Sequence, residues 1–434
     1  MFNQLISQFQ RLMDCLKCLP MKIMQTLLLV LFTVLPHYMY GQESQEVMKI
    51  SLEDVRSVAE AESPYYKEMA EEKEAVSKEI DTGLQRNNPS LNYDLEFLGD
   101  GNINEWEQFF FVEQTFERPG LYSSRETSAS HQKASLEHAL DDEGRSFFTS
   151  VRADYMNLIL LEHNIEVQET FIDHIEQLAE VARSQAEAGE LSPLEQQLID
   201  LSHLSISGEL ADLKADYQNK LSEWKERMGI APDTPVELTS EPPLTDISMP
   251  DLPEIHEESA AHPALMAAEF HTRAANESIR SAELRRFPEF DVSAGYKRMN
   301  PNLNGFLVGV SIPLPIINRN QAEIEQRSAE RRQADLIREQ QEQRLQIQWQ
   351  RQWETLNIYY SELKEARAGT LDIKQLGRRI ENGFVEGTIS LTDALNSFET
   401  GANGYRSYIS AMKNFYEALA EMEYLTDHNY IEAH

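Results

Sequence analysis

The chain has 434 residues, of which 41% are hydrophobic, and it carries a formal net charge of −34 at pH 7. A chain of this length can bury a large core, but its polar average composition excludes a helical membrane bundle. The strong negative charge also argues against nucleic acid as a partner, because the charge would repel the phosphate backbone.

The sequence has one long apolar run, Ile23–Tyr40, which follows a lysine and ends near small residues. This is the pattern of a secretory signal, which we expect to begin at Met21. Both cysteines, Cys15 and Cys18, precede it and have no partner cysteine elsewhere. We therefore predict that residues 1–41 are an upstream extension and a signal peptide, and that the mature protein contains no cysteine.

The rest of the sequence repeats a series of signals after about 198 residues. Each half has a helical segment closed by a proline, two short strands, a very long helix, a glycine turn and another long helix. We predict a first repeat over 42–230, a proline-rich linker over 231–258, a second repeat over 259–427 and a C-terminal tail over 428–434. The chain is thus expected to be a tandem duplication.

Two β-hairpins are expected, one in each repeat, because short alternating runs are joined by polar loops rich in Gly and Asn. The four strands are Asn92–Leu98, Phe109–Phe116, Phe290–Tyr296 and Phe306–Ile312. Strands with one apolar and one polar face suit a barrel wall in lipid, but four cannot close a barrel, and an open edge in lipid leaves backbone groups unpaired. Several chains would have to contribute strands. The alternative is a soluble four-stranded sheet.

The long helices carry narrow apolar seams with alternating steps of four and three, typical of coiled coils. We place one seam on each of three helices: Leu391, Leu395, Phe398, Ala402, Tyr405, Ile409, Met412, Tyr416 and Leu419; Val151, Leu158, Leu161, Ile165, Ile172, Ile175, Ala179 and Ala182; and Trp349, Trp353, Leu356, Tyr360 and Leu363. A helix from about Ser123 to Glu187 would be on the order of 95 Å long. Such helices indicate an extended or hollow assembly rather than a globular core.

Two glycine turns reverse the chain between long helices. In each turn, a glycine supplies the left-handed conformation that ends a helix, and a serine followed three positions later by a carboxylate has capping-box spacing. These residues are Gly189, Ser192 and Glu195 in the first turn, and Gly387, Ser390 and Asp393 in the second. We expect Leu191, Ile389 and Leu391 to be exposed, which favours partner binding there in addition to capping.

The order of these elements resembles the TolC family of outer-membrane efflux proteins across nearly all of the mature length. Residues 311–322 (SIPLPIINRNQA) resemble the family's return from the membrane into a long helix, most closely in the heavy-metal, CzcC-like branch. Residues 379–384 (RIENGF) through 393–395 (DAL) resemble the periplasmic hairpin tip. The corresponding segment of the first half, 116–122 (FERPGLY), has one proline where residues 311–322 have two. The point at which the first-half strand ends is therefore less well defined by the sequence.

The resemblance implies a mainly α fold with a small β part: a long coiled-coil α-helical barrel plus four β-strands per chain that contribute to a trimeric twelve-strand transmembrane β-barrel. The homotrimer would sit in the outer-membrane lipid of a Gram-negative bacterium, with most of each chain in the periplasm. The proline-rich linker would form part of a belt around the tunnel. A periplasmic adaptor protein would couple it to an inner-membrane pump of the RND type, and the channel would export metal cations or small toxic compounds passively.

By the same resemblance, the adaptor would contact the tips at Gly189, Leu191, Ser192, Gly387, Ile389, Ser390 and Leu391. Nearby acids are candidates for a tunnel gate or cation selectivity, because carboxylate rings around a pore attract cations. They are Glu187, Glu190, Glu195, Glu386 and Asp393. Each is also explained as a solvated helix end, where acids favour the helix start.

The sequence also bears on two other functions. An enzyme is not expected, because the mature sequence has no HExxH, GxSxG, phosphate-binding glycine loop or CxxC pair, and the pair Asp200 and His203 has no matching metal ligands. No cofactor is expected. The alternative function is a structural periplasmic coiled coil that bridges envelope layers, which would not need two hairpins at equivalent points of a duplicated chain.

Overall fold

A computed structural model describes residues 47–98, 105–189, 191–242, 244, 247, 249, 261–299, 303–369 and 373–431. The expected signal peptide, part of the proline-rich linker and the last three residues of the expected tail lie outside these described residues.

The chain divides into two compact units. The smaller unit comprises Met1–Ile50 and Asp233–Leu238, and its described part contains two short parallel strands, β1 (Met48–Ile50) and β4 (Val236–Leu238). The Lys49 ammonium and the Glu237 carboxylate lie 3.0 Å apart across this pair. The larger unit comprises Ser51–Pro232 and Thr239–His434.

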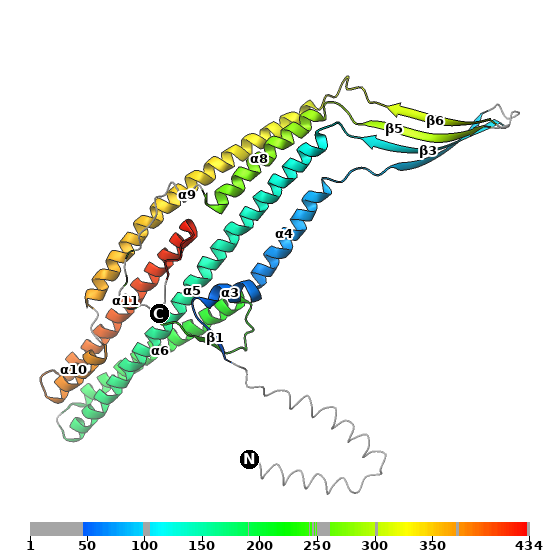
Figure 1. Cartoon of the computed structure of the whole chain (residues 1–434). Helices are drawn as coiled ribbons and strands as arrows, with labels where there is room; N and C mark the ends of the chain where they lie inside the picture. Colours follow the sequence, from blue (N-terminus) through cyan, green and yellow to red (C-terminus); the bar gives the residue numbers. More distant parts are fainter. Residues whose placement is uncertain are drawn as a thin grey trace, which may run out of the picture. The chain divides into compact units, whose positions relative to one another are not determined.

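The elements of the larger unit follow the expected order in both halves of the chain (Figure 1). The first half contains α3 (Asp54–Glu62), α4 (Pro64–Thr82), β2 (Ser90–Leu98), β3 (Glu105–Phe116), α5 (Leu121–Glu187) and α6 (Pro193–Met228). The second half contains α8 (Pro263–Leu284), β5 (Phe290–Met299), β6 (Leu303–Ser311), α9 (Gln321–Gly369), α10 (Ile373–Val385) and α11 (Leu391–Thr426). The prediction of a mainly α fold with two β-hairpins is confirmed.

Helix α5 is the longest element, with 67 residues, and it connects the sheet to the first glycine turn. Its sequence contains no proline, and it is bounded by Gly120 and Gly189, whose φ angles are 91° and 78°. Both glycines adopt a left-handed conformation that other residues rarely adopt. Among the described helices, none is both long and apolar enough to cross a membrane.

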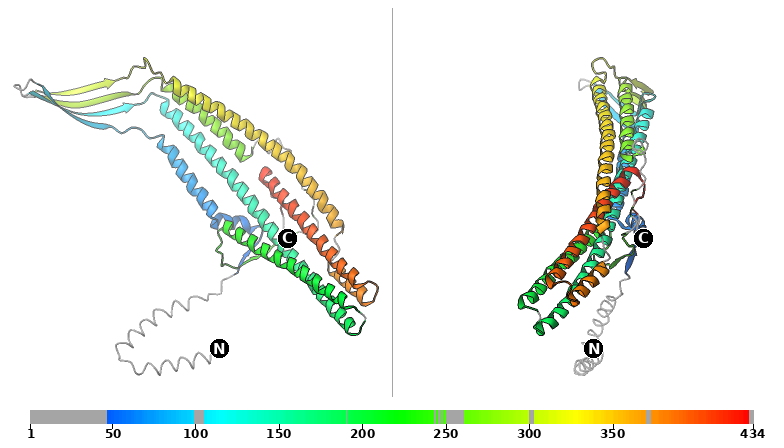
Figure 2. Two further views of the ribbon diagram at one scale, coloured as in Figure 1. Left: turned by 180° about the vertical axis from the view of Figure 1, so that it is seen from behind. Right: turned by 90° about the vertical axis from the view of Figure 1, so that its left-hand side faces the viewer.

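The helices of the larger unit lie side by side (Figures 1 and 2). Toward the sheet, α4, α5, α8 and α9 pack in that order, while at the other end α5 packs against α6, α10 and α11. Helix α5 therefore contacts both halves of the chain. It also fixes the distance between the sheet and the two helical turns.

The seam predicted for α11 is confirmed, since all nine of its residues are buried. The seam predicted for α5 is partly wrong: Leu161, Ile165, Ile172 and Ala179 are only half-buried. The buried positions there are Asn164, Gln168, Phe171, Ile175, Leu178 and Ala182. Two of the buried positions, Asn164 and Gln168, carry amides, so a search for apolar residues alone does not find the seam's alternating spacing of four and three. An apolar pattern alone therefore shifted this part of the seam by one residue.

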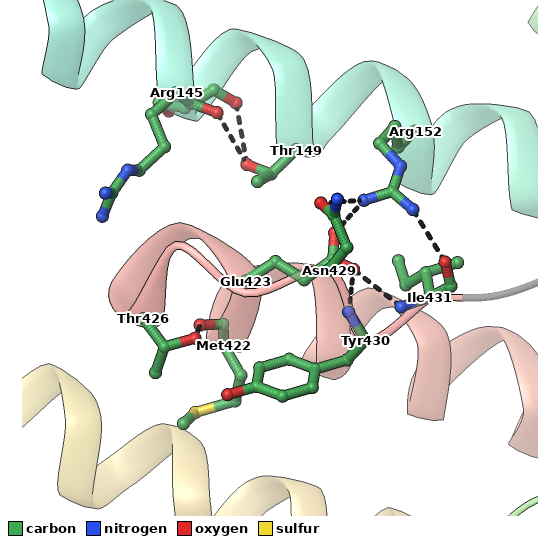
Figure 3. Close-up of polar contacts among 10 residues, drawn as sticks. Arg145, Thr149, Arg152, Met422, Glu423, Thr426, Asn429, Tyr430 and Ile431 are labelled. Atoms are coloured by element: carbon green, nitrogen blue, oxygen red, sulfur yellow. Dashed lines mark hydrogen bonds and ion pairs between the residues drawn. The ribbon is translucent and has the colours of Figure 1, made fainter. Parts of the chain in front are cut away.

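The chain that follows α11 is fixed to α5 by a buried ion pair (Figure 3). Arg152 on α5 and Glu423 on α11 are both buried, and their charged groups lie 2.9 Å apart. The Glu423 carboxylate also accepts hydrogen bonds from the backbone N–H groups of Tyr430 and Ile431, at 2.6 and 2.7 Å. Burial raises the pKa of Glu423 even though Arg152 acts in the opposite direction. Removing either partner would leave an uncompensated buried charge.

Candidate functional site

The two hairpins form one antiparallel sheet in the order β2-β3-β5-β6. They join through β3 and β5, where Phe116 pairs with Phe290 and Glu107 pairs with Met299. All four predicted strands are therefore present, and they belong to a single sheet that both halves of the chain build.

One face of this sheet is apolar and exposed. Side chains that alternate along a strand share a face, and the register places Tyr93, Phe110, Tyr296 and Phe306 in one row across all four strands. The Tyr93 and Phe110 rings lie 4.6 Å apart and the Tyr296 and Phe306 rings 6.2 Å apart. Phe306 is nevertheless 92% exposed. Within the described part of one chain, this row packs only along the sheet.

The opposite face carries charged and polar groups that pair across the strands. The Lys297 ammonium lies 2.6 Å from the Glu107 carboxylate, and the Thr115 hydroxyl donates to Asp291 at 2.7 Å. The sheet is therefore amphipathic, with its paired charges on one side and its aromatic row on the other.

The sheet also has two open edges. Strands β2 and β6 each pair with one neighbour, so one side of each strand has no partner strand in the sheet. An edge strand of this length with exposed apolar side chains is a template for pairing with another chain.

At the other end of α5, two capped turns form the helical tips. Gly189 and Gly387 adopt φ angles of 78° and 72°. Ser192 caps α6, with Glu195 bonding back to it, and Ser390 caps α11 with Asp393 in the same arrangement. Both predicted capping boxes are confirmed.

The tips contain a small hydrophobic core, and this core contradicts the expectation that Leu391 is exposed. Leu391 is only 2% exposed and packs in a cluster with Ile380, Phe384 and Phe398. The prediction that Leu391 is exposed was wrong, because this residue begins the buried seam of α11. Leu191 and Ile389 are half-buried and pack against the same cluster. These residues are thus packed inside the chain, whereas Leu194 and Leu201 of α6 and Val385 of α10 remain exposed near the tips.

The acidic candidates near the tips fall into two groups. Glu187, Glu386 and Asp393 are exposed, and Glu195 is half-buried. The carboxylates of Glu195 and Asp393 bond to the capping serines. Hydrogen bonds from the Ser192 backbone and hydroxyl lower the pKa of Glu195. Glu190 lies outside the described residues.

Sequence reasoning missed a contact that joins the two tips. His174 on α5 lies 2.6 Å from the Glu381 carboxylate on α10, and its ring stacks on Phe398 of α11. The ring occupies space left by Gly377, where an added Cβ would lie 2.2 Å from it. A glycine inside a helical pattern was the available signal, because such a glycine often marks a close approach.

Among the described residues, no group of three or more His, Cys, Asp or Glu side chains is arranged to hold a metal ion. His203, which sequence spacing paired with Asp200, instead lies 3.2 Å from Glu176 on the neighbouring helix α5.

Comparisons with known proteins agree with this geometry. Residues 255–422 match the family described as outer membrane efflux protein. A comparison of the sequence with curated proteins found no match.

The structure is similar to several solved structures. A membrane protein from Pseudomonas aeruginosa aligns with a TM-score of 0.72 and 16% identity, covering 86% of this chain and 92% of that one. The Campylobacter jejuni CmeC outer membrane channel aligns at 0.71 and 10% identity, with 86% and 85% covered. CusC aligns at 0.69 and 14% identity, with 86% and 90% covered. The matched family and the named matches are channels and membrane proteins rather than enzymes, and the chain has the fold of outer-membrane efflux channels.

Proposed function

We propose that this protein is the outer-membrane channel of a tripartite efflux system, with most of the chain in the periplasm. The observation that carries the proposal is the amphipathic sheet with an exposed aromatic row, attached to helices far longer than a globular core requires. Exposed apolar strands of about ten residues suit a lipid-facing wall. The match of residues 255–422 to an outer-membrane efflux family supports the same function.

The open edges of the sheet support a homotrimer. In lipid, unpaired backbone groups are costly, so a spanning sheet must close. If β6 of one chain pairs with β2 of the next, three chains of four strands close a barrel of about twelve strands. The long helices would continue from this barrel as a hollow tunnel. Both edges would then be paired.

The tips are the proposed contact surface for a periplasmic adaptor, which couples the channel to an inner-membrane pump of the RND type. The surface would comprise Gly189, Leu191, Ser192, Gly387, Ile389, Ser390 and Leu391. Leu391 would contribute by shaping the turn, because its side chain is buried. The two turns share the same capping geometry, which supports recognition of both by one kind of partner.

The acids near the tips are the proposed gate and cation filter. Glu187 and Glu386 are the better candidates because the carboxylates of Glu195 and Asp393 are already bonded to the helix caps. Replacing Glu187 and Glu386 by Gln should reduce cation selectivity in planar-bilayer recordings. Unchanged selectivity and closed-state conductance would remove this part of the proposal.

The proposed cargo is metal cations or small toxic compounds. Its support is the resemblance of residues 311–322 to the heavy-metal branch. Cells that lack the channel gene should become more sensitive to divalent metal salts, or to organic dyes if the second class applies. The two sensitivities separate the two classes of cargo.

The test of the main proposal is the native mass of the protein in the outer-membrane fraction after detergent extraction. A trimer in that fraction is expected. A soluble monomer or dimer in the periplasm would overturn the channel and favour a coiled-coil protein that bridges envelope layers. Its long helices would be retained under that alternative, but its exposed sheet would have no explanation.

A further inference from the structure

Two aromatic side chains lie on the polar face of the sheet. Successive side chains of a strand point to opposite faces, so Phe109 and Phe111 of β3 lie on the other side from Phe110 and share the face of Glu107. Both rings are half-buried. The interior of a membrane barrel is polar, so the wall that the proposed function requires does not account for these two rings.

The Phe109 ring already holds a cation. Lys297 pairs with Phe109 in the register of β3 and β5, and its ammonium lies 4.7 Å from the centroid of that ring. The same ammonium lies 2.6 Å from the Glu107 carboxylate, which is only 7% exposed. An ammonium over an aromatic ring is attracted by the negative face of the ring, and aromatic sites recognise organic cations in the same way.

The surface beside the Phe111 ring lacks side chains that would cover it. The residue opposite Phe111 on β5 is Gly295, and the next residue in this row, on β6, is Leu307. An added Cβ at Gly295 would lie 2.4 Å from the Cβ of Phe111, so a larger residue does not fit there. In the adjoining row, Gly305 has open space where a side chain would begin. The two glycines thus keep the surface between Phe111 and Leu307 shallow and apolar.

Carboxylates surround these rings. Among the described side chains of the polar face, five are carboxylates and one is an ammonium, so the net charge is 1 − 5 = −4. Glu96 stands directly opposite Glu107, an arrangement in which like charges are destabilising. The face therefore keeps its negative charge at a cost in stability, and that charge attracts cations. The charged residues of this face are Asp94, Glu96, Glu107, Glu113, Asp291 and Lys297.

We propose that the polar face of the sheet binds organic cations with an aromatic body at the Phe111 ring. The inference rests on the proposed function, in which this face lines the channel, and it names a chemical class of cargo. The cation would lie over Phe111 as the Lys297 ammonium lies over Phe109, with its apolar body against Leu307. Glu113, two positions along the same strand, would supply the opposite charge. An ion such as Mg²⁺ keeps its water shell and gains little from a ring.

The test is the binding of ethidium, an aromatic monocation, to the full chain purified in detergent. Phe111→Leu removes the ring but keeps an apolar side chain, and Phe110→Leu makes the same change one residue away on the opposite face. Phe111→Tyr keeps the ring. Phenanthridine, the uncharged ring system of ethidium, measures what the positive charge contributes. The native mass of each preparation is measured alongside.

We expect Phe111→Leu to raise the Kd for ethidium about fivefold, which corresponds to a lost cation–π contact of about 1 kcal/mol. Phe110→Leu and Phe111→Tyr should leave this Kd unchanged, and phenanthridine should bind more weakly than ethidium. A trimer in which Phe111→Leu has no effect, or which binds phenanthridine as tightly, would overturn the inference while the proposed function stands. An equal rise for Phe110→Leu would indicate a general disturbance of the sheet and would also overturn it. A monomer would overturn the proposed function, and with it the placement of this site in a channel.

Discussion

The tips and the sheet use apolar side chains in opposite ways. At the tips, residues from α5, α6, α10 and α11 bury one another, so that Phe171 and Phe398 are fully enclosed within a single chain. In the sheet, the aromatic row follows an equally regular pattern, yet Phe306 remains almost fully exposed. An apolar pattern therefore identifies which face is apolar, but not what covers it. The cluster at the tips is covered within the chain, although Leu194 and Leu201 of α6 stay exposed beside it, whereas the aromatic row of the sheet has no cover within the described part of the chain.

The largest effect is expected where the chain covers its own apolar face. Phe398→Ala removes a fully buried ring that packs edge-on against Phe171 and stacks on His174. The loss should be about 3–5 kcal/mol, because the cavity adds to the lost burial. Thermal unfolding in detergent, followed by circular dichroism, measures it. Phe306→Ala is the matched control; an equal loss there would contradict the contrast between the two regions.

A charge on the apolar face of the sheet should disturb membrane insertion rather than the packing of the chain. Phe306→Arg is expected to cost about 2–4 kcal/mol if the residue lies near the bilayer midplane. The amount of protein in the outer-membrane fraction measures this loss. Asp94→Arg, which places the same side chain on the polar face, should be tolerated. Equal losses for both variants would show that lipid does not distinguish the faces.

The burial of His262 in the larger unit should make the stability of the protein depend on pH. His262 is buried and caps α8 by accepting from the Ala264 N–H at 3.3 Å. Tyr424 and Asp142 face its ring, and burial lowers its pKa to about 4, with nearby Arg145 acting in the same direction. Below about pH 6.5 the unfolded chain takes up a proton that the folded chain rejects. Stability should therefore fall by up to about 3 kcal/mol as the pH drops from about 6.5 to about 4.

His262→Asn keeps a side-chain acceptor at the cap and removes the titrating ring. Unfolding measured across this pH range should show a shallower slope for the variant. The same slope in both proteins would assign the pH dependence to other groups.

The smallest effect is expected at the caps, where the two tips are most alike. Ser192→Ala and Ser390→Ala each remove an acceptor for a backbone N–H in the first turn of a long helix. Each should cost about 1 kcal/mol. Hydrogen exchange of the first-turn amides in α6 and α11 measures the loss, and Ser→Thr at the same positions should restore most of the protection. Exchange that stays unchanged in the alanine variants would mean that the caps do not hold the tips.

The accuracy of sequence-based prediction differed between these regions. The strands, the capping boxes and the α11 seam followed from local spacing, because period and cap chemistry depend on residues close together in the chain. The α5 seam was displaced because Asn164 and Gln168 occupy buried positions that a purely apolar pattern omits. The contact between His174 and Glu381 joins residues 207 positions apart, so local spacing could not pair them, and Gly377 indicated only that something approaches the helix closely there.

The sequence by itself determined the elements, their order in two similar halves and the polarity of each face, because these depend on short-range periodicity and on turn residues. Only the tertiary structure decided that the two hairpins share one sheet, that Leu391 is buried, and that the aromatic row stays exposed. Such outcomes depend on which distant segments meet. Apolar groups leave water wherever the chain can cover them, and the fold alone shows where the chain does so and where it leaves an apolar face uncovered.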